Sequence, residues 1–226
     1  MEEYIPAIIT ASVALIAAVG AQFLNNFLTY KRENKKYLRE VYEKFISEYF
    51  MDVLLYIDVE TDPRKGHDIE EQIDINKVIN SMMNKMHYAD RNLQGVYFDF
   101  KTRNHFYDPK GDIKEILGIK ICYYFLAYSN FIMKKLKIKF DKGLKFRLNY
   151  NLKAYGYWHL LSELYGYENR LTNEDMTALH MTKKFVLEEF SLKKIDSLIN
   201  HHHKMEKKAK EFLIKVREKN DITKNY

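Results

Sequence analysis

The sequence predicts an all-α protein in which a single N-terminal transmembrane helix precedes a cytoplasmic helical bundle. Residues 5–28 form an almost unbroken apolar run near the N-terminus. Beyond that run, apolar residues recur at spacings of three and four, the period of an amphipathic helix. Only 3 prolines and 8 glycines occur in 226 residues, so little interrupts this pattern. One short β-hairpin near residues 136–148 is the only departure from a helical fold that we expect.

The apolar run is long enough to cross a bilayer, covering roughly 36 Å at about 1.5 Å per residue against a hydrocarbon core of about 30 Å. Two acidic residues precede it, and a basic cluster follows it: Lys31, Arg32, Lys35, Lys36 and Arg39. The positive-inside rule then places the N-terminus outside and the remaining chain in the cytoplasm. The acidic start argues against a cleaved signal peptide. A buried helix of a soluble protein is the alternative, because alanine is more frequent than leucine in the run.

Small side chains share one face of this run. The residues are Ala7, Ala11, Ala14, Ala18, Ala21 and Asn25, at spacings of four and three. Small residues let transmembrane helices approach closely, and a buried asparagine can hydrogen-bond its counterpart on a second copy. We therefore expect this face, the anchor seam, to mediate self-association. A high alanine content alone explains the same pattern.

Composition divides the chain into four segments: an anchor at 1–30, a juxtamembrane helix at 31–60, a cytoplasmic bundle at 61–218 and a frayed tail at 219–226. No glycine or proline lies between Gly20 and Pro63, so anchor and juxtamembrane helix are expected to be continuous. A mean hydropathy of -0.46 indicates one span only. The single Cys122 excludes an intramolecular disulfide and a cysteine-based zinc cluster. Richness in Lys, Asn, Ile and Tyr is typical of AT-rich bacterial genomes.

Four further helices are expected in the bundle. Asp68 or Asp74 caps one that includes residues 78–86, whereas the pattern does not assign a structure to 96–107. A helix at 113–135, apolar on nearly every side, is predicted to be the buried centre of the bundle, with a second membrane span as the alternative. The other two are expected at 150–165 and from Thr172 to about 218, the latter with a break considered at Ser191. Asp112 with Glu115 three residues on reads as a capping box for the 113–135 helix.

Residues 136–148 alternate apolar and basic side chains around Asp141, Lys142 and Gly143, the pattern of a hairpin with a three-residue loop. A helix extending from either side fits nearly as well. The stretch belongs to a basic run made of Lys134, Lys135, Lys137, Lys139, Lys142, Lys145 and Arg147. We expect Lys135, Lys137, Lys139, Lys145 and Arg147 to contact phosphate groups of lipid headgroups or, less favoured, of nucleic acid. A solvated face is the other interpretation.

A heptad pattern occupies the second half of the last helix. Its positions are Ile195, Leu198, His202, Met205, Ala209, Phe212 and Val216. Such a stripe packs either against a second copy or inside one subunit. Both possibilities stay open at this point.

No catalytic residue, cofactor or metal site is predicted. The glycines are too scattered for a phosphate-binding loop, and no serine lies in a Gly-x-Ser-x-Gly elbow. Asp99 and Lys101 match half of a nuclease Asp-x-Lys pattern, but Asp112 and Lys114 match it as well by chance. The three histidines at 201–203 would point about 100° apart on a helix, so they cannot share one ion.

The first 60 residues consist of an acidic tip, an Ala/Ile-rich span and the segment Lys-Arg-Glu-Asn-Lys-Lys, which leads into a long helix. This layout resembles that of small single-pass bacterial membrane proteins of unknown function found on mobile elements and in defence loci. The resemblance is one of architecture. From the anchor, the helical pattern and the two association stripes we expect a membrane-tethered helical interaction or effector module that self-associates and has the bilayer as its partner. Two alternatives are a pore-forming or membrane-damaging effector and a membrane-tethered nuclease or nucleic-acid-binding protein.

Overall fold

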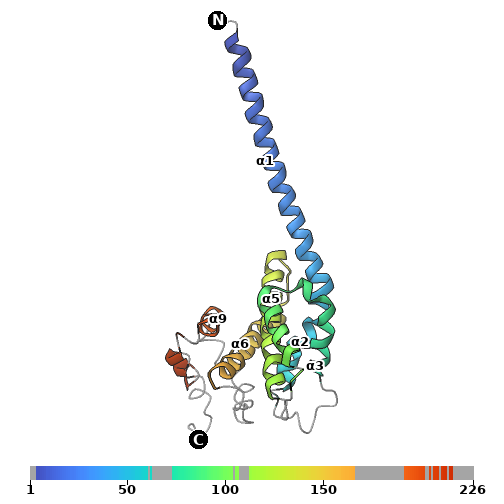
Figure 1. The fold of residues 1–226 in the computed structure, drawn as a ribbon, viewed down its shortest axis with the longest axis vertical. Coiled ribbons are helices and arrows are strands. Elements are labelled where there is room, and N and C mark those ends of the chain that lie inside the picture. The colour runs from blue at the N-terminus through green and yellow to red at the C-terminus, as the bar shows by residue number, and fades with distance from the viewer. Residues whose placement is uncertain are drawn as a thin grey trace.

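The computed structural model describes residues 4–60, 62, 73–103, 105–106, 112–165, 191–201, 204, 206–208, 210–212 and 214–215. All regular structure in these ranges is helical, and none of them contains a strand. One long helix projects from a group of packed helices (Figure 1). The all-α prediction is therefore confirmed.

The projecting helix continues into the core of the bundle. α1 (Ile5–Val41), a π-helical turn η2 (Tyr42–Ile46) and α2 (Ser47–Glu60) follow one another without a break, as expected from the absence of glycine and proline. Val41 is the first fully buried residue, and Phe45 and Ile46 in the π turn are the next. A π turn places one extra residue in the helix, which rotates the following side chains relative to α1. The anchor-bearing helix and the first core helix are therefore one element.

Two short helical segments and a longer helix follow. α3 (Ile75–Ser81) is capped by Asp74, whose Oδ1 accepts a hydrogen bond of 3.0 Å from the Lys77 N–H, so this capping prediction is confirmed. Asp68 lies outside the described residues. The 3₁₀ helix η3 (Met82–Tyr88) then leads to α4 (Arg91–Arg103), which occupies most of the stretch that the pattern left unassigned. Asp90 caps α4, because its Oδ1 accepts a hydrogen bond of 2.9 Å from the Leu93 N–H.

α5 (Asp112–Leu136) is the centre of the bundle. It packs against α1, η2, α2, α3, α4 and α6 (Lys142–Tyr165), and 67% of its apolar window is buried inside the structure. This burial is what a core helix requires and matches the central position predicted for residues 113–135. α5 passes the length and hydropathy test for a membrane span, as core helices of soluble proteins often do.

The predicted β-hairpin is wrong. α5 continues to Leu136, Lys137 adopts a left-handed φ of 58°, and α6 begins at Lys142, earlier than the expected residue 150. Lys137 N–H donates to the Lys134 carbonyl and Ile138 N–H to the Met133 carbonyl, which together form a Schellman cap. The alternating pattern misled because Leu144 and Leu148, four apart, share one helix face as readily as one strand face.

α9 (Leu192–Asn200) begins at Ser191, whose Oγ accepts a hydrogen bond of 3.2 Å from the Lys194 N–H. A helix that begins at Ser191 agrees with the break considered there, but the predicted helix from Thr172 to residue 190 lies outside the described residues. The expected run to residue 218 is not continuous, because α9 ends at Asn200 and His201 leaves helical geometry with φ -129°. Helical residues resume at Lys204. α9 packs against α6.

Candidate functional site: the projecting helix and the basic end of the bundle

The projecting helix, residues 5–37 of α1, exposes apolar side chains along its whole length. Ile16 and Phe23 are each 72% exposed, and nothing in the apolar window of this helix is buried. Exposed apolar surface costs about 25 cal/mol per Å² in water, and patches this extensive mark contact with lipid or protein. The helix is long and apolar enough to span a membrane.

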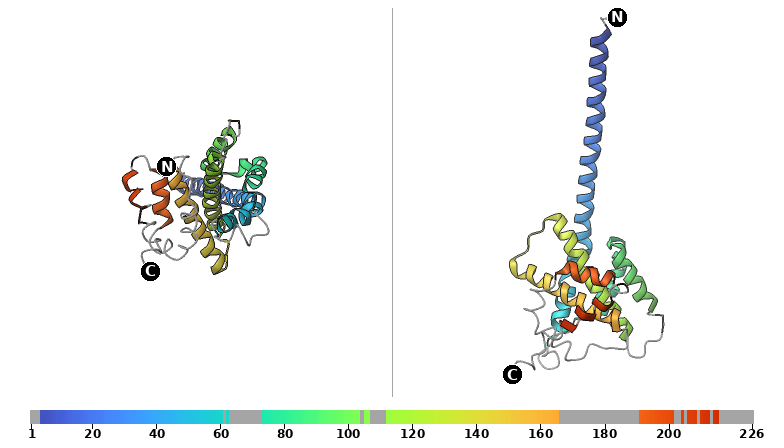
Figure 2. Two further views of the ribbon diagram at one scale, coloured as in Figure 1. Left: turned by 90° about the horizontal axis from the view of Figure 1, so that it is seen from below. Right: turned by 90° about the vertical axis from the view of Figure 1, so that its left-hand side faces the viewer.

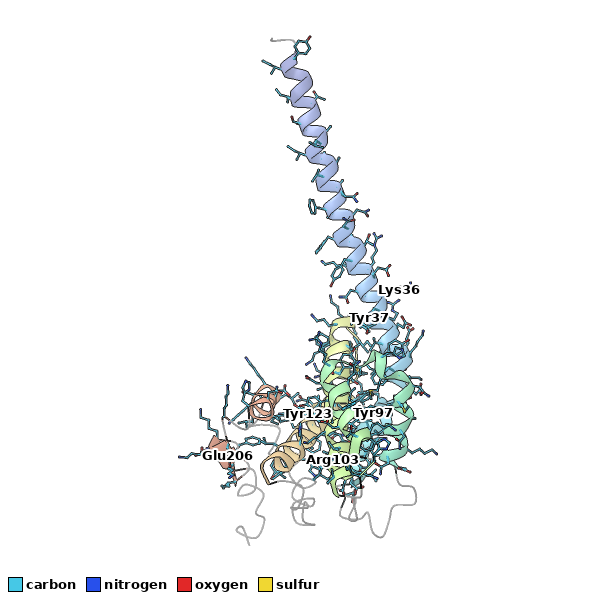
Figure 3. All side chains as sticks on the ribbon, in the orientation of Figure 1. Lys36, Tyr37, Tyr97, Arg103, Tyr123 and Glu206 are labelled. Carbon is cyan, nitrogen blue, oxygen red and sulfur yellow. The ribbon has the colours of Figure 1, made fainter. Side chains whose placement is uncertain are left out.

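Basic residues separate the apolar part of this helix from the bundle. Lys31, Arg32, Lys35 and Lys36 are all exposed, and the Lys31 Nζ lies 4.5 Å from the centroid of the Phe27 ring. An amine that folds back over an aromatic ring is typical of the interface between hydrocarbon and water. Lys36 and Tyr37 lie where the projecting helix reaches the bundle (Figure 3).

A short hydrogen-bond chain joins the helix to the bundle at this level. The Tyr88 hydroxyl donates to Glu40 Oε1 at 3.0 Å, and the Tyr128 hydroxyl donates to the Tyr88 carbonyl at 2.9 Å. Lys44 also donates to Glu40 at 2.7 Å, and these hydrogen bonds from Lys44 and Tyr88 hold the pKa of Glu40 below its ordinary value. Tyr128 on α5 is thereby held close to the level of Glu40.

From Tyr128, α5 continues eight residues to Leu136, about 12 Å of rise. Ten residues separate Glu40 from Tyr30 on the neighbouring helix, about 15 Å. Figure 1 and the right-hand view of Figure 2 place the connection between α5 and α6 at the end of the bundle from which α1 projects. The end of α5 therefore approaches the level at which the apolar run of α1 gives way to lysine and arginine.

Only some residues of the basic run line a common pocket. Lys134, Lys142 and Lys145 line a pocket of about 400 Å³ between the end of α5 and the start of α6, together with Asn130, Phe146, Leu148 and Asn149. Of the five residues predicted to contact phosphate, only Lys145 lines it. Arg147 pairs with Asp58 at 3.5 Å, and the Lys135 Nζ lies 5.5 Å from the Phe131 ring centroid. Lys137 and Lys139 are exposed outside the pocket.

The two predicted association stripes lie on different parts of the chain. Ala14, Ala18, Ala21 and Asn25 are exposed on the projecting helix, whereas nothing is described of the Ala7 and Ala11 side chains. In the heptad, Ile195 and Leu198 of α9 are buried within the chain, and Phe212 is 3% exposed. The other heptad positions, His202, Met205, Ala209 and Val216, lie outside the described residues.

The structure does not gather the candidate nuclease residues. Asp99 and Lys101 lie on α4, where residues two apart do not face each other, and the Lys101 Nζ donates 2.8 Å to Asn80 Oδ1. Within the described ranges, no three His, Cys, Asp or Glu side chains come close enough to share a metal ion. Burial raises the pKa of the Cys122 thiol to about 12, so it stays protonated.

One polar cluster, in which Tyr123 and His159 are buried and Asp196 is exposed, has no signal in the sequence. The Tyr123 hydroxyl of α5 donates to Asp196 of α9, and the His159 ring of α6 lies edge-on to both Tyr123 and Tyr124 at 5.6 and 5.5 Å. Tyr123 points from α5 toward α9 (Figure 3). Burial raises the pKa of Tyr123, which keeps its phenol neutral. The cluster ties three helices together.

These features define a class: an all-helical protein whose first helix is long and apolar enough to span a membrane and continues directly into a packed bundle. A comparison of the chain with protein-family models, curated proteins and solved structures finds no match.

Proposed function

We propose that the protein is a single-pass, membrane-tethered helical module that self-associates and acts as an interaction or effector module in a bacterial cell. Residues 5–30 cross the cell membrane with the N-terminus outside, and the bundle lies in the cytoplasm. The resemblance of the first 60 residues to single-pass proteins of defence loci and mobile elements suggests a role in one of those settings.

One observation carries the tether: the apolar side chains of the projecting helix have no partner surface in the described part of the chain. Leu15 is 67% exposed and Phe27 is 53% exposed, although both belong to a well-formed helix. A soluble protein would pack such a helix on its core. The basic cluster at residues 31–39 supports the orientation, because lysine and arginine are retained on the cytoplasmic side.

Self-association is supported by the anchor seam. A lone transmembrane helix with alanine every three to four residues leaves shallow grooves, which a second copy fills by close van der Waals packing. Asn25 lies near the cytoplasmic end of the seam, where its amide can pair with the same residue of another copy.

Alkaline carbonate extraction of membranes tests the tether. The wild-type protein is expected to stay in the membrane pellet. A variant with Leu15→Arg, Ile16→Arg and Val19→Arg is expected to appear in the supernatant, since each arginine costs about 2.5–3.5 kcal/mol at the centre of a span. These side chains do not contact the bundle, so circular dichroism of the bundle should be unchanged. Extraction of the wild-type protein by carbonate would overturn the tether.

Protease added to intact cells tests the orientation. The bundle is expected to survive, and to be cleaved only after the membrane is permeabilised. Digestion of the bundle in intact cells would place it outside and reverse the proposed topology.

A further inference from the structure

The pocket between α5 and α6 is built from cations and amides. Lys134 comes from the last turns of α5, and Lys142 and Lys145 come from the first turn of α6. Asn130 and Asn149 add side-chain amides, and Phe146 and Leu148 complete the lining. No acidic side chain lines this pocket among the described residues. A group that enters it meets hydrogen-bond donors that carry positive charge.

Lys142 and Lys145 lie at a helix end that favours an anion, whereas Lys134 lies in the last turn of α5, where a cation is favourable. The N-terminus of a helix carries a partial positive charge and favours acidic side chains. The first turn of α6 contains no acidic residue, and Asp141 at its cap accepts from the Leu144 N–H. Within the part of the chain that the structure describes, Lys134, Lys142 and Lys145 form no ion pair. An anion in the pocket would reduce the repulsion between the lysines and would add to the negative charge that Asp141 already supplies at the N-terminus of α6.

The position of the pocket suggests the source of that anion. The connection between α5 and α6 is at the end of the bundle from which the projecting helix leaves (Figure 2). Phe131 and Phe146 at this end are 51% and 57% exposed. Exposed aromatic rings beside lysines are typical of surfaces that meet the headgroup region of a bilayer. The formal net charge of +6 adds a general attraction to an anionic membrane.

We propose that this pocket binds the phosphate group of an anionic lipid headgroup in the cytoplasmic leaflet. The inference rests on the proposed tether, which brings the pocket to the bilayer. The lysines supply charge, and the two asparagine amides can donate to phosphate oxygens. A volume of about 400 Å³ lies within the usual range for small-ligand sites. Lipid binding here would hold the bundle upright against the membrane.

Binding is measured on the full-length protein in a neutral detergent by its thermal unfolding, followed through the fluorescence of the single Trp158. A ligand that binds only the folded state raises Tm, and the rise grows with the logarithm of the ligand concentration relative to Kd. We expect short-chain phosphatidylglycerol to raise Tm, and short-chain phosphatidylcholine and inorganic phosphate to have little effect at the same concentration.

Two charge-matched variants separate the pocket from general charge. Lys134→Gln with Lys145→Gln removes two pocket lysines and should weaken the apparent affinity for phosphatidylglycerol by at least about tenfold. Lys137→Gln with Lys139→Gln removes the same charge from exposed positions outside the pocket and should leave the affinity within about twofold. An equal loss of phosphatidylglycerol affinity in both variants would contradict specific binding in the pocket and would leave only a diffuse electrostatic attraction.

The remaining outcomes assign the ligand. If inorganic phosphate raises Tm as much as the lipid does, the ligand is a soluble phosphate and not a lipid headgroup. A rise with a single-stranded oligonucleotide, lost in the pocket variant, would replace lipid by nucleic acid. If carbonate leaves the protein in the membrane but phosphatidylglycerol gives no shift, this inference fails while the tether stands. If carbonate extracts the protein, the tether itself fails.

Discussion

The hydroxyl of Tyr155 in α6 donates a hydrogen bond of 2.8 Å to the backbone carbonyl of Val53 in α2. Four residues earlier on α6, the Asn151 amide donates to the carbonyl of Leu54. Both donors are fully buried. Because α2 is the continuation of the projecting helix, these two bonds attach α6 to the same element that carries the anchor. Together with the packing of α1 and η2 on α5, this buried contact fixes the continuous helix in the bundle.

Tyr155→Phe should lower the free energy of unfolding by about 0.5–1.5 kcal/mol, the usual net contribution of one hydrogen bond. The ring stays, so packing is preserved and the loss reports the bond to Val53. Urea unfolding followed by Trp158 fluorescence measures it. Tyr30→Phe, at a side chain 71% exposed, is the matched control and should leave stability unchanged. Equal stability of Tyr155→Phe and wild type would mean that the hydroxyl contributes nothing.

Gly156→Ala and Gly95→Ala should have opposite effects. A Cβ at Gly156 would lie 2.6 Å from the Ile195 side chain of α9 and 3.0 Å from Tyr123, so α9 must shift, at a cost of about 1–3 kcal/mol. Nothing lies within 4 Å of a Cβ at Gly95 in α4, where alanine should stabilise the helix by about 1 kcal/mol. Thermal unfolding of the two variants compares them directly. A stabilised Gly156→Ala protein would contradict the close approach of α6 and α9.

Lys137→Gly should stabilise the protein by about 1 kcal/mol, because glycine adopts the left-handed conformation of a Schellman cap without the penalty that lysine bears. The φ of Lys137 is 58°. Lys139→Gly removes the same charge two residues later and should give no gain. Chemical denaturation ranks the three proteins. A loss of stability in Lys137→Gly would show that the end of α5 is not capped in this way.

The free energy of unfolding should fall as pH rises above about 10. Burial raises the pKa of Tyr49 from 10.0 to about 12, and burial also raises the pKa values of Tyr56 and Tyr150. In the unfolded chain these phenols lose their protons near the ordinary value, while the folded protein keeps them. The stabilisation is thus complete below pH 10 and is lost as pH rises through the raised values. Denaturation at a series of pH values measures the slope, and Tyr56→Phe should make it shallower. An unchanged slope in that variant would exclude Tyr56 as a contributor.

Ala14→Ile with Ala18→Ile should reduce the mass of the detergent-solubilised protein toward that of a monomer, because larger side chains block close approach at the anchor seam. Leu15→Ile with Val19→Ile alters a neighbouring face of the same helix and should leave the mass unchanged. Light scattering measures both. A monomeric wild-type protein, or an unchanged mass in the seam variant, would remove the seam from assembly.

Leu198→Lys tests the heptad separately. Leu198 is 3% exposed in α9, so a lysine there should unfold the contact between α9 and α6 and cost several kcal/mol. Circular dichroism and thermal unfolding detect this loss. Clean dissociation of an oligomer with the fold intact would instead place the heptad between subunits.

Local patterns in the sequence were sufficient for the features that depend on one segment. A few neighbouring residues are enough for the apolar run, the continuous helix without glycine or proline, the Asp74 cap and the helix start at Ser191. The buried centre at α5 was also predictable, because a helix that is apolar on nearly every side has no face to present to water. These properties are set by short-range sterics, hydrogen bonding and hydrophobicity.

Tertiary structure decided the rest. The alternation at residues 136–148 fits a strand and a helix end equally well, and the packing of Leu148 and Asn151 against the core selected the helix. The pair of Tyr123 with Asp196, 73 residues apart, has no local signature. The lysine pocket likewise arises only because Lys137 reverses the chain and sets the start of α6 beside the end of α5. Contacts between distant segments depend on how whole helices pack, and a single sequence does not specify that packing by any local rule.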